Sequence, residues 1–269
     1  MSPRPLLDTV VFGLTRITPA LIALTVVRFP VDPAAATLFV QRILVLASLI
    51  LAWNVAEGTF AVYLQKRDRS PSTSRGYLFA TFLFGIVVLG LFGVFRSCST
   101  QGLFLLLLAV LSLRGMGRVG WDQDRLRLSM ACTLAAHTLL ALLSLLCASE
   151  GVEWQKGVFA LGIGLSTCAV ELAWHSSLLS APATARIAAP LFRISLVGGP
   201  LAIASLAFTS QLPFCYTATY LALLPALRVL SSLRRSGQPL PGTIRGSAGV
   251  FGIFLGIMVA CRAYLSAGQ

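Results

Sequence analysis

The residues best suited to chemistry are polar side chains inside long apolar segments. Asn54 and Glu57 interrupt one such segment a helical turn apart, and Glu171 interrupts another. An ionisable residue at the centre of a membrane-spanning helix costs about 2.5–3.5 kcal/mol, so its presence there indicates a function. We therefore take Asn54, Glu57 and Glu171 as candidate catalytic residues, and we expect them to line one polar cavity.

A basic segment follows the first of these positions. The loop expected at 65–76 carries Lys66, Arg67, Arg69 and Arg75. Lysine and arginine hold phosphate groups through charge-assisted hydrogen bonds. We take these four residues as candidate substrate-binding residues, with a diphosphate as the group they would hold.

Glu57 also has a structural alternative, in which it joins two helices by pairing with Arg42 or Arg16. No metal ligand set is predicted around it, because none of the six cysteines lies in a CxxC pair or near a histidine at ligand spacing. Walker, nucleophile-elbow and HExxH signatures are missing as well.

Glu171 has a structural alternative of the same kind. His175 lies four residues further along the expected helix, so the two side chains could bond to each other, or Glu171 could bond a neighbouring carbonyl. His137, alone in its own apolar segment, fits a satisfied polar core residue better than a ligand.

Composition defines the elements that must position these residues. Of the 269 residues, 57% are hydrophobic and 11% charged, with a mean hydropathy of +0.85. A soluble domain carries about 25% charged residues, and many apolar runs here approach the roughly 20 residues that cross a bilayer. The chain is therefore predicted to be an all-α, polytopic membrane protein forming one transmembrane domain over residues 1–269.

Nine helices are expected, and the break between two of them falls at Pro213. The glycine-rich stretch 249–256 is interpreted as a seam where helices pack closely. The expected helices are 10–28, 37–64, 77–96, 101–114, 126–147, 157–179, 187–209, 212–231 and 247–265.

The loops between these segments alternate in charge. Loops 65–76, 114–127 and 228–246 hold most of the arginines, whereas the intervening loops hold few. The positive-inside rule then places the N-terminus in the cytoplasm and the C-terminus outside, in what we expect to be a bacterial inner membrane. Because the basic residues lie in short loops, the net charge of +12 indicates contact with anionic lipid headgroups, and nucleic-acid binding is not expected.

The polar site and the basic loop together resemble the UbiA superfamily of intramembrane prenyltransferases. That family carries an Asn-Asp-x-x-Asp-x-x-x-Asp motif followed by an Arg-Pro-x-Pro-Ser-Gly-Arg-like stretch. With Asn54 on the family's asparagine, residues 69–75 (RSPSTSR) fall on the second stretch without a gap. The tail 233–260 is similar to the end of UbiA-like proteins of the EboC type. The three aspartate positions are occupied here by Val55, Gly58 and Val62.

The resemblance implies a UbiA-like helical bundle that transfers a prenyl group from an isoprenyl diphosphate to an acceptor, with Mg²⁺ as cofactor. The missing aspartates remove most of the carboxylates that would hold Mg²⁺. Two alternatives therefore stay open. One is a non-catalytic protein that binds an isoprenoid or lipid, or scaffolds a partner, and the other is a lipid or oligosaccharide flippase.

Overall fold

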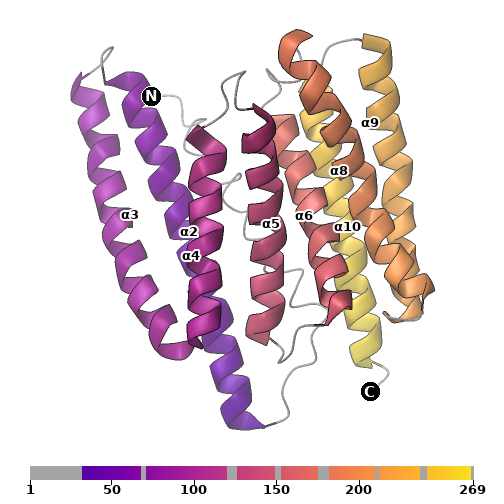
Figure 1. Cartoon of the computed structure of the whole chain (residues 1–269), viewed down its shortest axis with the longest axis horizontal. Coiled ribbons are helices and arrows are strands. Elements are labelled where there is room, and N and C mark those ends of the chain that lie inside the picture. The colour runs from indigo at the N-terminus through magenta and orange to yellow at the C-terminus, as the bar shows by residue number, and fades with distance from the viewer. Residues whose placement is uncertain are drawn as a thin grey trace. The chain divides into compact units, whose positions relative to one another are not determined.

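The computed structural model describes residues 32–67, 71–119, 126–148, 153–174, 182–209, 212–236 and 241–267. Within these ranges every element is a helix (Figure 1). The helices are α2 (Pro33–Lys66), α3 (Pro71–Cys98), α4 (Gln101–Val119), α5 (Leu126–Ala148), α6 (Trp154–Trp174), α8 (Pro182–Phe208), the 3-10 helix η2 (Phe214–Ala222), α9 (Leu223–Ser236) and α10 (Pro241–Ala267).

Eight of the nine predicted segments coincide with these helices, and the first, 10–28, lies outside the described residues. Among the described residues, six helices are long and apolar enough to cross a membrane, as expected of an integral membrane protein. A count of nine spanning helices stays a prediction. Several helices begin at a proline, which has no N–H and so removes one of the unpaired donors of the first turn. At the start of α2, the Asp32 side chain also accepts a hydrogen bond from the Ala35 N–H (3.0 Å).

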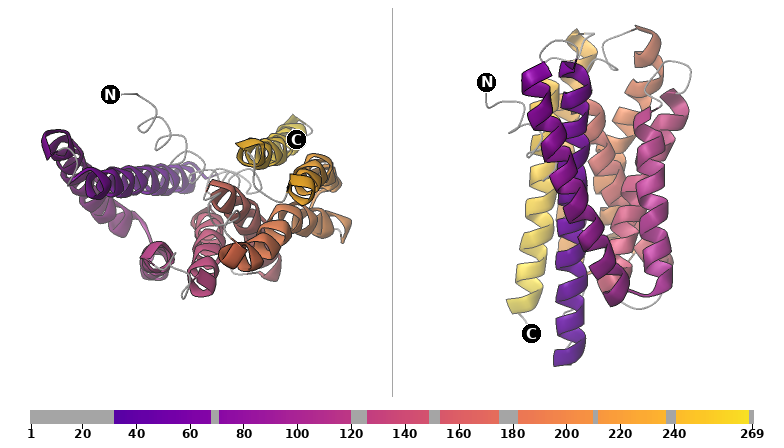
Figure 2. Two further views of the ribbon diagram at one scale, coloured as in Figure 1. Left: turned by 90° about the horizontal axis from the view of Figure 1, so that it is seen from above. Right: turned by 90° about the vertical axis from the view of Figure 1, so that its left-hand side faces the viewer.

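The described helices gather into two units, one ending at Phe104 and the other starting at Leu105, so the division falls inside α4. A single domain over 1–269 stays a prediction. In the first unit, α2 and α3 run side by side in opposite directions (Figure 2). The two helices are joined by the Thr59 and Thr81 hydroxyls (2.9 Å) and by a hydrogen bond from Arg42 Nε to the Cys98 carbonyl (2.6 Å). Both contacts fit one register, so the hairpin keeps its alignment over most of its length.

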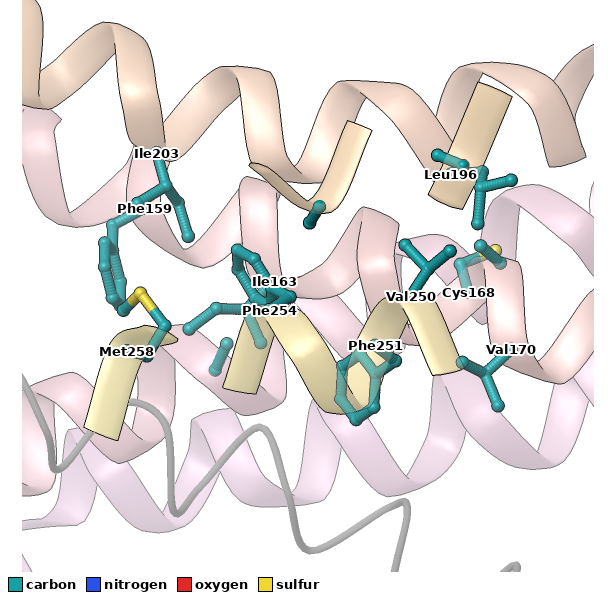
Figure 3. Close-up of a cluster of buried hydrophobic side chains, with 14 of the residues drawn as sticks. Phe159, Ile163, Cys168, Val170, Leu196, Ile203, Val250, Phe251, Phe254 and Met258 are labelled. Atoms are coloured by element: carbon teal, nitrogen blue, oxygen red, sulfur yellow. The ribbon is translucent and has the colours of Figure 1, made fainter. Parts of the chain in front are cut away.

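The second unit is a close-packed bundle in which α6 contacts α5, α8 and α10. Its core includes Phe159 and Ile163 from α6, Ile203 from α8, and Phe254 and Met258 from α10 (Figure 3). Helix-on-helix packing in a membrane depends on small residues that let backbones approach.

The close approaches in this bundle occur at glycines of α6 and α8. A Cβ on Gly164 would lie 2.8 Å from the Thr138 backbone of α5, and one on Gly199 would lie 2.7 Å from the Gly162 carbonyl. The prediction that the glycines of 249–256 let two helices approach closely is wrong among the described residues. A Cβ on Gly249, Gly252 or Gly256 would meet nothing within 4 Å.

The segment after Pro213 differs from the plain helix expected at 212–231. Its first nine residues form the 3-10 helix η2, and the α-helical part starts at Leu223. Pro225, in the first turn of α9, has no N–H to give to the Leu221 carbonyl at the junction of the two windings. The hydroxyls of Thr217 and Thr219 bond the carbonyls three residues earlier (2.7 and 2.8 Å), which occupies acceptors in this tighter winding.

Candidate functional site

Asn54 and Glu57 lie one turn apart in the C-terminal half of α2. The Asn54 side chain is buried, and its Nδ2 donates a hydrogen bond to the Ile50 carbonyl (2.7 Å) one turn earlier. Glu57 is half-buried. Helical geometry puts the two side chains on adjoining parts of one face, as the sequence predicted.

The structural alternative in which Glu57 pairs with Arg42 is wrong. Both residues lie on the continuous helix α2, about four turns and roughly 22 Å apart. Arg42 instead donates to the Cys98 carbonyl near the end of α3. Arg16, the other predicted partner, lies outside the described residues.

The candidate phosphate-binding residues gather where α2 ends and α3 begins. The Lys66 ammonium sits 5.1 Å from the centre of the Tyr77 ring, a cation–π contact that joins the two helices. Arg67 caps α2, and Arg67 and Arg75 are both exposed. Arg69 lies outside the described residues. The described part of the predicted set therefore presents three cations at one end of the α2–α3 hairpin.

An apolar groove runs between α2 and α3 below this basic end. Its volume is about 630 Å³, within the range of about 300–1,000 Å³ that is common for ligand sites. The α2 side is a stripe of Trp53, Ala56 and Phe60, and the α3 side includes Leu78 and Gly85. Phe60 is six residues from Lys66, about 9 Å along the helix. The groove therefore ends within side-chain reach of the cations.

The groove and the polar face of α2 are neighbours on the same helix. Ala56 lines the groove, and Glu57 follows it directly, about 100° further round the helix. Asn54 likewise follows Trp53. Glu57 therefore lies beside the groove, whereas Asn54 lies about 160° round the helix from Ala56 and points away from the groove.

Glu171 lies in the second unit, where it pairs with His137, a residue that was not expected to be its partner. His137 of α5 bonds Glu171 of α6 through Nε2 and Oε2, and the two side chains are only 4% and 8% exposed. His137 as a satisfied polar core residue is thus confirmed. His175, the partner considered for Glu171, lies outside the described residues.

The predicted cavity that joins Asn54, Glu57 and Glu171 stays a prediction, since α2 and α6 belong to different units. The groove and the His137–Glu171 pair were both missed. For the pair, the available signal was one ionisable residue in each of two consecutive spans. For the groove, it was the Trp53, Ala56 and Phe60 spacing on one helical face.

The donors available for Mg²⁺ are few. No three His, Cys, Asp or Glu side chains in the described ranges gather closely enough to hold a metal ion. Glu57 is the single carboxylate in the sequences of α2 and α3. This donor set does not fit a magnesium site built on two or more carboxylates, whereas the three cations fit a phosphate group directly.

The fold and the groove define an all-helical protein with several membrane-spanning candidates and an apolar site beside a basic edge. No protein family, curated protein or solved structure matches this chain.

Proposed function

We propose that this protein binds an isoprenyl diphosphate within the membrane. The observation that carries the proposal is the apolar groove between α2 and α3 that ends beside Lys66, Arg67 and Arg75. The groove would take the hydrocarbon chain, and the three cations would take the diphosphate. Arg69, from the loop between the helices, is expected to join them.

Physical chemistry supports this division of the site. An isoprenoid chain gains about 25 cal/mol for each Å² that it removes from water. In a bilayer, however, its tail competes with lipid chains that are as apolar as the groove. Discrimination must then come from the headgroup, where Lys and Arg form charge-assisted hydrogen bonds to phosphate oxygens.

Transfer of the prenyl group to an acceptor is the second candidate function. The half-buried carboxylate of Glu57, next to the lining residue Ala56, favours it. In this version Asn54 and Glu57 orient the diphosphate or the allylic cation. The departing diphosphate would be neutralised by the cations of the hairpin.

Equilibrium binding of labelled geranylgeranyl diphosphate to the purified protein tests the proposal. The variant Lys66→Gln/Arg67→Gln/Arg75→Gln is expected to weaken binding at least tenfold, about 1.4 kcal/mol. The matched control is Arg193→Gln/Arg228→Gln, which removes two exposed arginines of the other unit. Geranylgeraniol, which has no phosphate, should bind weakly and with equal affinity to the wild type and to the triple variant. Absence of binding at micromolar diphosphate, or equal loss in both variants, contradicts the proposal.

A further inference from the structure

Two cysteines, one in η2 and one in α10, lie at the same end of the contact between these helices. Cys215 is the second residue of η2, and Cys261 lies in the last two turns of α10. Cys261 lies in the buried cluster of the η2–α10 contact, Cys215 packs against that cluster, and both thiols are free and close enough to interact electrostatically. Tyr216 and Arg262 lie next to the pair and interact with each other electrostatically.

The hairpin of η2–α9 and α10 holds these thiols in register. At its other end, a Cβ on Gly246 would lie 2.5 Å from a methyl of Val229, so the two helices touch there. The contact between residues 229 and 246 and the contact between residues 215 and 261 fit the same antiparallel alignment. The alignment of the two helices therefore brings positions 215 and 261 to the same level of the hairpin.

The 3-10 winding of η2 is what turns Cys215 toward α10. A 3-10 helix advances about 120° per residue and an α-helix about 100°. Over the eight residues from Cys215 to Leu223 this difference accumulates to about 160°. An α-helical winding of the same segment would place Cys215 on nearly the opposite side of the helix, away from Cys261.

The predicted sidedness puts this pair on the oxidising side of the membrane. Arg234, Arg235 and Arg245 belong to the opposite end of the hairpin, which the positive-inside rule assigns to the cytoplasm. Adjacent thiols facing a periplasmic or extracellular compartment form stable disulfides, whereas cytosolic thiols stay reduced.

We propose that Cys215 and Cys261 form a disulfide that fixes the 3-10 segment against α10. A protein disulfide of the oxidising compartment is the oxidant. The half-buried Cys215 thiolate attacks one donor sulfur and displaces the first donor thiol. The buried Cys261 thiolate then attacks the Cys215 sulfur of this mixed disulfide and displaces the second donor thiol. Two protein thiols are oxidised to one disulfide, and the donor disulfide is reduced to two thiols.

The test uses the wild-type protein in its membrane. Intact cells are treated with N-ethylmaleimide before lysis, and the protein is then unfolded, digested and analysed by mass spectrometry. We expect the peptides of Cys215 and Cys261 to be recovered mainly as one linked species that is lost when reductant precedes the maleimide. Cys147 and Cys168, which are buried and in no disulfide, serve as internal controls and should carry maleimide in both samples.

Recovery of Cys215 and Cys261 as separate maleimide adducts without reductant would overturn the proposal. The variant Cys261→Ser gives a second readout, since Cys215 should then appear fully as a maleimide adduct. A Cys215 that stays blocked in that variant would show a different partner and would equally refute the pair. These outcomes are independent of isoprenyl diphosphate binding, which concerns the other unit.

Discussion

The α2–α3 hairpin and the α5–α6 pair are built from similar apolar sequence but use it differently. In the spanning windows of α2 and α3, 28% and 11% of the residues are buried, against 61% and 78% in α5 and α6. The α5–α6 pair buries His137 and Glu171 against each other. The hairpin leaves an open groove and exposed cations. This difference fits the proposal that the first unit binds a ligand while the second is a packed support.

The largest effect is expected from breaking the polar pair in the second unit. His137→Ala leaves the buried Glu171 carboxyl without its histidine, which should cost about 3 kcal/mol of unfolding free energy. Unfolding of the purified protein in mixed detergent micelles measures the loss. Leu128→Ala, at an exposed position of the same helix, is the control and should cost well under 1 kcal/mol. Equal losses would remove the special role of the pair.

Two glycine substitutions in the second unit should change the free energy of unfolding in different directions. Gly164→Ala drives a methyl into the Thr138 backbone and should cost about 1–3 kcal/mol. Gly252→Ala meets open space and should leave stability unchanged or raise it by up to about 1 kcal/mol, because alanine favours the helix. The same micelle unfolding assay compares them. A destabilising Gly252→Ala would show that the 249–256 face is packed after all.

In the first unit, filling the groove should affect binding and leave folding intact. Gly85→Leu places a side chain in the groove and should weaken geranylgeranyl diphosphate binding about tenfold, close to 1.4 kcal/mol. Gly93→Leu, on the same helix at an exposed position outside the lining set, is the matched control. Inorganic diphosphate should bind wild type and both variants alike. If Gly93→Leu weakens chain binding as much as Gly85→Leu, the groove is not the chain site.

The smallest effect is expected at Glu57. Glu57→Gln keeps the size of the side chain at the groove's edge, so binding of the diphosphate should change less than about twofold. A product assay with an aromatic acceptor then separates the two candidate functions. Loss of prenyl transfer with intact binding would assign catalysis to this carboxyl, and wild-type protein without product would favour the binding role alone.

The helices were predictable because their signals are local. Apolar length marks a span, and Pro33, Pro71, Pro182 and Pro241 each start a helix in the structure. The 3-10 winding of η2 was not predicted. A nearby proline does not signal it, since Pro190 and Pro200 lie inside the continuous α-helix α8.

The partners of the candidate site residues were not predictable in the same way. In lipid, apolar side chains gain little by facing another helix, so hydrophobicity does not encode which face packs. Gly164 and Gly252 lie in similar glycine-containing apolar runs, yet only Gly164 touches a neighbouring backbone. His137 and Glu171 lie in separate spans, and their pairing follows from the alignment of α5 with α6.

Photo-crosslinking tests the central assignment most directly. Purified protein is irradiated with an isoprenyl diphosphate that carries a diazirine in its chain, and the labelled peptides are identified by mass spectrometry. The account predicts labels on residues 53–60 and 78–89, suppressed by excess unlabelled diphosphate. Suppressible labels confined to α5, α6, α8 or α10 would contradict it.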